Sequence, residues 1–513
     1  SEVAVYVVIA LIFCLVVLEV ALDSYAIPFI LLANIGIAIL YNVGTNILLG
    51  QISYITKAIS AVLQLGVTMD FAIFLYHSYK AEKEINKDKN EAMANAIQKT
   101  FTSVVGSSLT TIAGFLALCS MNLTLGKDIG LVMAKGVLLG VITVVTVLPA
   151  MILQFDGLIE KTKHKEILPK FTGVKNFVMK HYKVFIIILP IAFYGYQNTG
   201  VYYNLTKSLP SSLASIQANS KLEEDFDMVS MEMLLVDKDM PDAKVDQMVN
   251  EIENLDGIEW VMSYSKMEKY LPREMLPEDI SSIFVSDKYQ MILINSKYET
   301  ATNELNAQVN TINDIVKKYD ENSMLAGEGP LMKDLVEISD HDFNSVNSFS
   351  IGIIFVIMIF VLKSISLPVI LMCVIEFAIF INMGIPYYTN TVLPFIASIV
   401  IGTIQLGATI DYAILITTKY IANRKDGKDK KTSIDEALGT SISSIVVSGL
   451  CFFGATFGVG AYSKIEMIGS LCTLMSRGAI ISMVTVIAVL PAFLTVFDKI
   501  VCKTTVGMKE IKA

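Results

Sequence analysis

The sequence has few of the residues that hold disulfide-bonded, metal-binding or catalytic sites together. Six cysteines and four histidines are spread over 513 residues. None of the cysteines falls in the polar segment 202–345, so no disulfide framework is indicated there. The scattered histidines provide no spacing typical of a metal site. The polar segment also contains no nucleophile–base pair, and an enzyme is therefore disfavoured.

Charged residues are scarce as well, at 17%, whereas hydrophobic residues make up 53% of the chain and the mean hydropathy is +0.58. This composition is too apolar for a soluble enzyme. Runs of about 20 apolar residues are long enough to cross the hydrocarbon core of a membrane. They predict eleven membrane helices, at 3–22, 26–44, 54–79, 101–121, 129–155, 183–201, 346–364, 367–386, 393–418, 440–461 and 467–497.

The charges that are present are unevenly distributed. Segment 202–345 carries 28 acidic and 12 basic residues, whereas the remainder carries 28 basic and 21 acidic residues. By the positive-inside rule, the basic loops face the cytoplasm and segment 202–345 lies on the opposite, extracytoplasmic side. These basic loops are Lys80–Thr100, Asp156–Lys183, Lys419–Asp435 and the tail from Asp498.

The membrane part is internally repeated. The heptapeptide Gln64–Asp70 recurs almost unchanged as Gln405–Asp411, and both copies lie inside predicted helices. Because the two units run in the same direction, they predict a parallel repeat about an axis along the membrane normal. Further matches at offsets of 340–342 pair Pro28 with Pro368, Asn42 with Asn382, Gly114 with Gly454, Lys135 with Arg477 and Pro149 with Pro491.

These patterns divide the chain into membrane and outer parts. Alternating strand and helix patterns predict a βαββαβ order in the outer part, with strands near 230–237, 258–264, 290–296 and 323–326 and helices at 242–255 and 300–319. The predicted domains are a first five-helix repeat (1–160), a cytoplasmic linker (161–182), a helix (183–201), an outer domain (202–345), a second five-helix repeat (346–500) and a cytoplasmic tail (501–513).

The second repeat is preceded by a helix and an outer domain, whereas the first is preceded by nothing in the numbered chain. The predicted topology also places Ser1 on the outer side. We therefore expect an equivalent first helix and a first outer domain of similar size ahead of Ser1. A protein with eleven helices is the alternative.

Four motifs, in their order and spacing, carry a resemblance to a known family over essentially the whole chain. They are Gly-x-x-x-Asp-(Tyr/Phe) in two helices, Leu-Pro-Ala at the end of each repeat, Ser208-Leu-Pro210 and Gly327-Glu-Gly-Pro330. They resemble the resistance–nodulation–division (RND) superfamily and, within it, the MMPL-type exporters of bacteria.

The resemblance implies an RND/MMPL fold in the bacterial cytoplasmic membrane, with a ferredoxin-like, porter-type outer domain. It also implies proton-driven export of lipids or other amphiphilic molecules. No cofactor is expected, since protons serve as the coupling ion, and membrane lipids rather than nucleic acids are the expected partners. The sequence leaves open the substrate, the coupling ion, and whether a second copy or an accessory subunit completes the transporter.

Asp70 and Asp411 are the candidate coupling groups, because a carboxylate deep in a bilayer is costly and marks a functional site. Gly66 and Gly407 lie one turn earlier on the same helix faces and let a neighbouring helix approach closely. Two facing carboxylates cannot easily both be ionised, so the pair is suited to binding and releasing a proton. A pair held in helix–helix hydrogen bonds is the alternative.

The two copies differ after the aspartate. Tyr412 follows Asp411 and adds a hydroxyl that can relay or orient a proton, whereas Phe71 follows Asp70. Many members of the family carry tyrosine in both repeats. We therefore expect an asymmetric relay in which Asp411 and Tyr412 form the better-equipped half.

Three further polar residues are predicted to support the relay. Ser108 and Ser448 occupy matching positions on helices that should border the aspartate helices, where they either contact the aspartates or simply pack. His77 lies two turns beyond Asp70 toward the cytoplasm. It either passes protons inward or is an ordinary histidine at the membrane interface.

Three charged residues lie apart from the aspartate pair. Glu376 stands mid-helix where the other repeat has Gly36, and it either lines a substrate path or bonds a neighbour. Lys135 and Arg477 either extend to the outer surface or take part in gating or in binding a lipid headgroup.

Two functions remain compatible with this sequence. The first is a proton-driven exporter. The second is a sterol-sensing-like or scaffold protein that binds lipid without pumping. The paired aspartates favour the exporter, because a sensor does not need two buried titrating groups.

Overall fold

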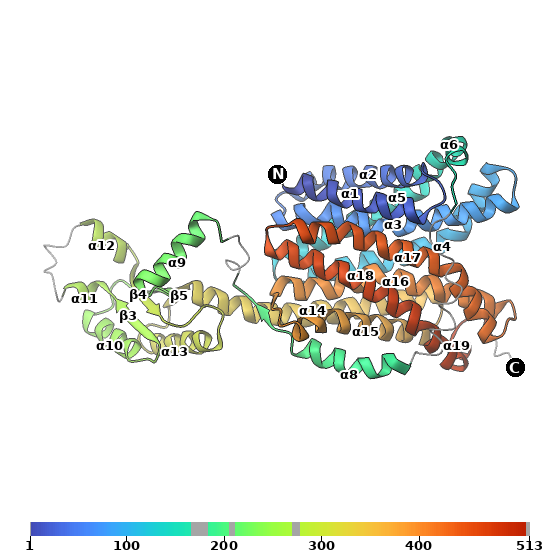
Figure 1. Cartoon of the computed structure of the whole chain (residues 1–513). Coiled ribbons are helices and arrows are strands. Elements are labelled where there is room, and N and C mark those ends of the chain that lie inside the picture. The colour runs from blue at the N-terminus through green and yellow to red at the C-terminus, as the bar shows by residue number, and fades with distance from the viewer. Residues whose placement is uncertain (1, 166–182, 205–210, 269–277, 509–513) are drawn as a thin grey trace. The chain divides into compact units, whose positions relative to one another are not determined.

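The computed structural model describes residues 2–165, 183–204, 211–268 and 278–508, drawn as ribbons in Figure 1. These residues form two compact units. The first unit combines Ser1–Val201 with Asp342–Ala513 and is helical. The second unit spans Tyr202–His341 and contains a sheet. It begins where the outer domain was predicted to begin, at residue 202, and ends at His341 rather than at 345.

Ten helices in the described part are long and apolar enough to cross a membrane. They confirm ten of the eleven predicted spans. The first repeat comprises α1 (Glu2–Ala21), α2 (Ile27–Thr45), α3 (Tyr54–Ile85), α4 (Lys89–Ala117) and α5 (Thr124–Gln154). The second repeat comprises α14 (Glu328–Leu362), α15 (Ser366–Tyr388), α16 (Phe395–Lys425), α17 (Lys430–Tyr462) and α18 (Glu466–Val496).

The eleventh predicted span, 183–201, corresponds to α8 (Lys183–Gln197), an apolar helix of 15 residues. It is shorter than the other ten, and the residues immediately before it lie outside the described part. The count of eleven therefore stays a prediction. The short helices α6 (Asp156–Lys161) and α19 (Asp498–Thr504) follow the last helix of each repeat.

Several helices run well past their apolar segments. The charged ends of α3 and α4 meet at a turn where Asp88 caps α4 by accepting a hydrogen bond from the Asn90 backbone amide at 2.9 Å. Asp429 caps α17 in the same way, through the Lys431 amide at 3.0 Å. Hydropathy predicts only the part of a helix that lies in lipid, whereas capped charged extensions continue it into water. The same reason explains why α14 begins at Glu328 rather than at 346.

The centre of the membrane unit is formed by α3 and α16, the helices that carry the repeated heptapeptide. Their most apolar windows are 100% and 89% buried, the largest fractions among the ten spans. Each packs against a helix of the other repeat, α3 against α17 and α16 against α4 (Figure 1). The two repeats are therefore joined through the helices that bear Asp70 and Asp411.

Glycines set the close approach at these two contacts, but in different ways. A Cβ atom at Gly66 would lie 2.3 Å from Cδ2 of Phe452 on α17. At Gly407 it would lie 3.6 Å from the Thr111 carbonyl oxygen of α4, and the Thr111 hydroxyl donates to the Gly407 carbonyl at 2.8 Å. The backbones of α16 and α4 are therefore in direct contact at Gly407, whereas at Gly66 the ring of Phe452 on α17 packs against α3.

The two repeats also differ in what covers their second helix. In the second repeat α8 packs on α15, where a Cβ at Gly195 would lie 2.8 Å from the Gly384 carbonyl oxygen. The corresponding Gly44 of α2 has no atom within 4 Å of such a position. Its neighbours Ile47 and Leu48 are each 83% exposed. A helix that would cover this face of α2, expected from the repeat, stays a prediction.

The second unit has a four-stranded antiparallel sheet in the order β3-β4-β2-β5, with helices in the predicted βαββαβ order. The elements lie within a few residues of their predicted positions. The unit also contains the shorter helices α9 (Ala214–Phe226), α11 (Tyr264–Glu268) and α12 (Glu278–Phe284). The main elements are β2 (Ser230–Asp237), α10 (Asp242–Glu253), β3 (Ile258–Met262), β4 (Tyr289–Ser296), α13 (Asn303–Tyr319) and β5 (Met324–Gly327).

Alternation along β2 explains how this unit folds. Leu234 and Val236 point into an apolar core shared with α10 and α13, where Val249 and Ile312 are also buried. Glu232 lies on the same face, fully buried, and neither of its carboxyl oxygens has a hydrogen-bond partner among the described residues. A strand with period-two alternation normally carries apolar side chains on its core face, so Glu232 is an exception.

The motif Gly327-Glu-Gly-Pro330 surrounds this carboxyl group. Gly327 has φ +127°, and a Cβ there would lie 2.7 Å from the Met231 carbonyl oxygen. A Cβ at Gly329 would lie 2.7 Å from Oε1 of Glu232, so the carboxyl group contacts the first turn of α14. Burial away from water raises the pKa of Glu232 to about 7.

We predict that the second unit loses stability between mildly acidic and mildly alkaline pH because of Glu232. Its pKa in the folded unit lies above the ordinary value of 4.5, so the stabilisation is complete below 4.5 and is lost as pH rises through 7. Between those values the free energy of unfolding should fall by roughly 1.4 kcal/mol per pH unit. Thermal unfolding followed by fluorescence of Trp260, the only tryptophan, reports on this unit.

The matched variant is Glu232→Gln, which keeps the size of the side chain and removes its titration. Its unfolding temperature should vary little between about pH 5 and about pH 8, and should exceed that of the wild type at the higher value. An equally steep pH dependence in both proteins would contradict the assignment to Glu232.

The glycine contacts predict unequal effects of the same substitution in the two repeats. Gly66→Ala should destabilise the membrane unit by ~1–3 kcal/mol, because its methyl group meets the Phe452 ring in a packed interior. Gly407→Ala should be nearly neutral, since its nearest atom is at ordinary contact distance. Thermal unfolding of the purified protein in detergent measures both. Adding Phe452→Leu should restore stability to Gly66→Ala, and equal losses in the two alanine variants would refute the packing argument.

Candidate functional site

Asp70 of α3 and Asp411 of α16 lie in the interior of the membrane unit, each only 2% exposed. They are close enough to interact electrostatically. Oδ1 of Asp70 and both carboxyl oxygens of Asp411 have no hydrogen-bond partner within the described ranges. Three of the four oxygens are thus unpaired, which is not the arrangement of a pair fixed by helix–helix hydrogen bonds. Such buried, unpaired carboxyl groups are costly unless a proton or water is supplied to them.

The hydroxyl groups around the pair are asymmetric. Ser448 of α17 lies beside Asp70 and beside the Tyr412 hydroxyl, although neither hydroxyl makes a well-aligned hydrogen bond. Tyr412 is fully buried. The matching Ser108 of α4 instead donates to the Val105 carbonyl of its own helix at 3.0 Å. The hydroxyls of Ser448 and Tyr412 therefore lie beside the aspartate pair, whereas the Ser108 hydroxyl is bonded to its own helix.

His77 lies on α3 toward the end that carries Lys80 and Lys83, which the charge distribution predicts to be cytoplasmic, and its Nδ1 is 2.8 Å from Oγ of Ser444 on α17. It lines a pocket of about 430 Å³ between the cytoplasmic ends of α3, α4, α16 and α17. We call this pocket the vestibule. It is lined by Phe74, His77, Ser78, Ala81, Lys99, Thr100, Ser103, Val104, Leu415, Thr418, Lys419, Ala422, Thr440 and Ser444.

A polar cluster near the outer ends of the helices occurs in both repeats. In the first, the Asn42 side-chain amide donates to Oε1 of Gln64 at 2.8 Å, and the Gln64 amide donates to the Gly136 carbonyl at 3.0 Å. In the second, Asn382 donates to Gln405 at 2.8 Å. These bonds satisfy polar groups that lipid cannot satisfy.

The residues Gln64 and Gln405 were not predicted as functional, although they open the repeated heptapeptide. Each is buried and ties its aspartate helix to the helices on either side, in the second repeat also through Ser482 Oγ at 2.9 Å. The signal was present in the sequence as an unchanged glutamine in both copies. A substitution-tolerant position would not be expected to match in two diverged repeats.

Lys135 and Arg477 belong to these same clusters. Lys135 Nζ donates to the Asn42 carbonyl at 3.0 Å, and Arg477 donates to the Asn382 side chain at 2.8 Å and to its carbonyl at 2.7 Å. They thus bond the C-terminal halves of α2 and α15, a favourable location for a cation. A role in gating or headgroup binding stays a prediction.

Glu376 lies away from the aspartate pair, on α15. It is close enough to Tyr196 of α8 to interact electrostatically, and its Oε1 has no hydrogen-bond partner among the residues that the structure describes. Its role in a substrate path stays a prediction. The sequence motif Ser208-Leu-Pro210 lies outside the described residues.

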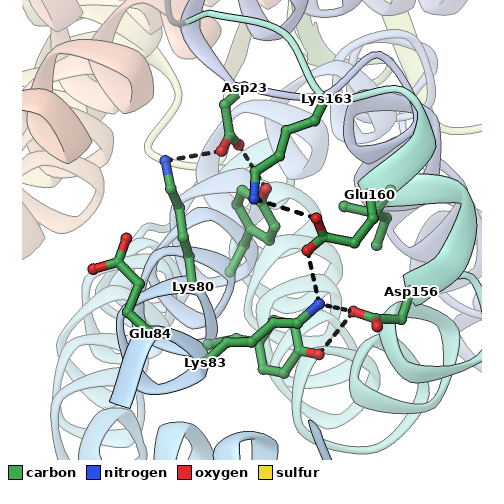
Figure 2. A pocket seen from close by; sticks show the side chains of 10 residues that line it. Asp23, Lys80, Lys83, Glu84, Asp156, Glu160 and Lys163 are labelled. Atoms are coloured by element: carbon green, nitrogen blue, oxygen red, sulfur yellow. Dashed lines mark hydrogen bonds and ion pairs between the residues drawn. The ribbon is translucent and has the colours of Figure 1, made fainter. Parts of the chain in front are cut away.

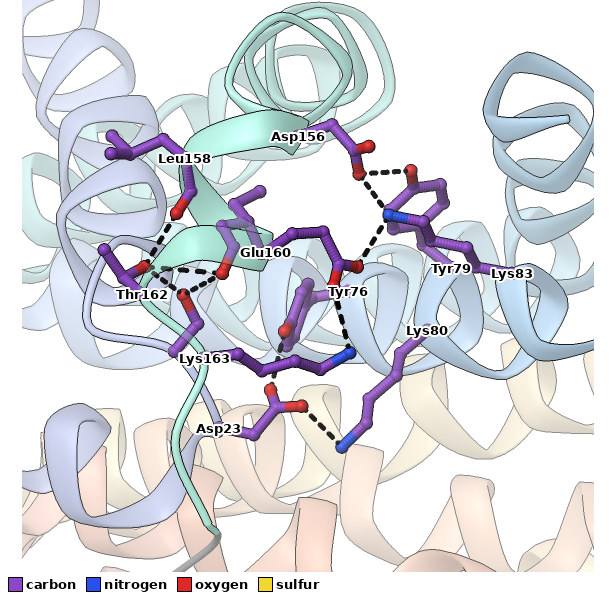
Figure 3. A network of polar contacts seen from close by, with 12 residues as sticks. Asp23, Tyr76, Tyr79, Lys80, Lys83, Asp156, Leu158, Glu160, Thr162 and Lys163 are labelled. Atoms are coloured by element: carbon purple, nitrogen blue, oxygen red, sulfur yellow. Dashed lines mark hydrogen bonds and ion pairs between the residues drawn. The ribbon is translucent and has the colours of Figure 1, made fainter. Parts of the chain in front are cut away.

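The cytoplasmic end of the first repeat carries a network of ion pairs, shown in Figures 2 and 3. Lys80 pairs with Asp23 at 2.9 Å, and Lys83 pairs with Asp156 at 2.6 Å. The Tyr76 hydroxyl donates to Asp23 at 2.7 Å, as Figure 3 shows. The network joins the cytoplasmic extension of α3 to the turns that follow α1 and α5.

The electrostatics of Asp23 agree with a fixed structural role. Burial alone would raise the pKa of Asp23, but hydrogen bonds from Lys80 and Tyr76 outweigh it and hold the pKa below its ordinary value. The second repeat has a simpler equivalent, in which Arg424 forms two hydrogen bonds to Asp498 at 3.0 and 2.9 Å. Both networks anchor the aspartate helices at their cytoplasmic ends.

Comparison with known proteins agrees with this architecture. The chain is 36% identical over 100 residues to the membrane protein ActII-3 of Streptomyces coelicolor, covering 20% of this chain and 14% of that protein. It is 26% identical over 176 residues to the hopanoid transporter HpnN of Rhodopseudomonas palustris, covering 34% and 20%. It is 21% identical over 183 residues to the mycolic acid-containing lipids exporter MmpL11 of Mycolicibacterium smegmatis, covering 34% and 19%.

These matches are partial, since the chain covers at most 20% of the length of the three relatives. The family model extends much further. The model described as the MMPL family matches residues 1–166 and 206–507, which include both repeats and most of the second unit. The described residues contain ten helices long and apolar enough to cross a membrane, so this chain is a multi-pass membrane protein, and it belongs to the MMPL family.

Proposed function

We propose that this protein uses proton binding at Asp70 and Asp411 to drive the export of lipids or other amphiphilic molecules. The observation that carries the proposal is the pair itself. Two buried carboxyl groups from different repeats are close enough to interact, and three of their four oxygens have no hydrogen-bond partner in the part of the chain that the structure describes. Groups that served only to hold helices together would be expected to satisfy their hydrogen bonds.

The physical basis of coupling is repulsion in an apolar interior. Two like charges interact far more strongly there than in water, so both carboxyl groups are not ionised at once without strain. A proton arriving at one of them removes the repulsion and permits closer approach. Because each aspartate helix packs on a helix of the other repeat, this change acts between the repeats. Movement of one repeat against the other is how parallel-repeat transporters alternate their access.

Tyr412 and Ser448 supply the proton-handling groups beside the pair. Both hydroxyls can donate and accept, and neither is committed to a well-aligned hydrogen bond. Each hydroxyl can therefore accept a hydrogen bond from a protonated aspartate or donate one to an ionised aspartate. His77 and the vestibule provide a polar region between this pair and the cytoplasm.

The substrate class rests on the relatives and on the membrane setting. The names of two relatives describe a transporter of hopanoids and an exporter of mycolic acid-containing lipids. By analogy we assign lipids or similar amphiphiles to this protein and a porter-type role to its second unit. A sterol-sensing-like protein that does not pump is the weaker alternative, because it would gain nothing from two unpaired buried carboxyl groups.

We predict that Asp70→Asn and Asp411→Asn each abolish proton flux through the purified protein. Asparagine keeps the size and polarity of the side chain but removes titration. Proteoliposomes that contain a trapped pH-sensitive dye and a lipid extract measure the flux after a membrane potential is imposed. Phe71→Tyr should retain flux, because it gives the first repeat the tyrosine that follows the aspartate in the second repeat.

The control is Glu466→Gln, which removes an exposed carboxyl group in the first turn of α18. It should retain flux, and all variants should reconstitute to the level of the wild type. Wild-type flux in either asparagine variant would overturn the coupling role of the pair.

A further inference from the structure

The charged residues that line the vestibule, at the cytoplasmic ends of α3, α4, α16 and α17, are all basic. Among its lining residues are three basic side chains and no carboxylate. The basic residues are His77, Lys99 and Lys419, and the hydroxyl residues are Ser78, Thr100, Ser103, Thr418, Thr440 and Ser444. Four of these hydroxyls, those of Ser78, Thr100, Thr418 and Thr440, donate to backbone carbonyls. The basic side chains, with no acidic group in the lining, are what make the pocket complementary to an anion.

The charge of Lys419 is the least compensated. Its Nζ donates to the Thr440 carbonyl at 2.8 Å, and it has no carboxylate partner in the described part of the chain. Lys99 differs, because it forms an ion pair with Glu82 outside the lining. His77 is engaged with Ser444. Among the three basic residues of the lining, Lys419 is therefore the one that has neither a carboxylate nor a side-chain partner within the described residues.

The vestibule is lined from equivalent positions of the two repeats. Twelve of its fourteen lining residues correspond in pairs: Phe74 with Leu415, His77 with Thr418, Ser78 with Lys419, Ala81 with Ala422, Thr100 with Thr440 and Val104 with Ser444. Both repeats thus build the pocket, but only the second places a lysine at the position of Ser78. The apolar members of these pairs give the pocket walls that an acyl or glycerol group can contact.

We propose that the vestibule binds an anionic phosphate or carboxylate group, with Lys419 as its main charge partner. The group is carried either by a lipid of the cytoplasmic leaflet or by a free anion. The helices that line the vestibule continue into the basic segments Lys80–Thr100 and Lys419–Asp435, which are predicted to face the cytoplasm, and basic segments beside a membrane attract anionic lipids. The proposal does not depend on proton coupling, because it concerns binding alone.

Native mass spectrometry of the detergent-purified protein tests this site. The probes are phosphatidylglycerol as the anionic lipid and phosphatidylcholine as the lipid without net charge. Lys419→Gln should weaken phosphatidylglycerol binding about tenfold, equivalent to ~1.4 kcal/mol, and leave phosphatidylcholine unaffected. The control Lys430→Gln removes an exposed cytoplasmic lysine outside the vestibule and should bind as the wild type does.

A second variant makes the test independent of any loss of folding. Ser78→Lys adds a cation at the matching position of the first repeat and should tighten phosphatidylglycerol binding by a similar factor. Inorganic phosphate distinguishes the two sources: competition with the lipid indicates that a free anion also binds, and lack of competition assigns the site to lipid headgroups. Unchanged binding in both Lys419→Gln and Ser78→Lys would overturn the proposal.

Discussion

The structure depends on the cost of placing polar groups where lipid cannot solvate them. A carboxylate in the bilayer core is unfavourable by several kcal/mol, about 2.5–3.5 on insertion scales. Asp70 and Asp411 are accommodated because they lie on the two most buried helices, away from lipid and beside the other repeat. The central position of α3 and α16 therefore follows from the residues that they carry. The remaining helices surround them with apolar surface.

The same constraint explains the polar clusters at the outer ends of the helices. Gln64 and Gln405 bond to neighbouring helices rather than to their own, and Gly136 and Gly478 leave room for them, since a Cβ at either position would lie within about 3 Å of the glutamine side chain. Each aspartate helix is held at one end by these amides. At the cytoplasmic end it is held by ion pairs to Asp156 or Asp498. Between these anchors, the aspartates lie where α3 and α16 pack on helices of the other repeat.

Much of this arrangement could be predicted from the sequence, because it depends on local patterns. Hydropathy predicted ten of the membrane helices, and the repeat predicted which of them correspond. The βαββαβ order followed from strand and helix periodicity in segments such as 230–237. The aspartates were found because a buried charge in an apolar helix is conspicuous in one sequence alone.

What the sequence could not predict depends on contacts between distant segments. The partner of Gly66 is Phe452, and nothing near either residue in the chain indicates that they meet. The vestibule has the same origin, since His77 and Lys419 come together only when two repeats are packed about their axis. Buried Glu232 was missed because a single acidic residue in an alternating strand ordinarily faces solvent.

The two repeats carry the same aspartate but differ in the groups around it. Tyr412 occupies the position that Phe71 has in the first repeat, and Ser448 lies beside Asp70 whereas Ser108 donates to a carbonyl of its own helix. A symmetric pair would bind a proton with equal probability on either side and give no direction to the movement that follows. An asymmetric pair has a preferred site for the proton, because the hydroxyls lie around only one combination of residues. In the proposed mechanism, divergence between the repeats at these positions would give protonation and movement a defined order.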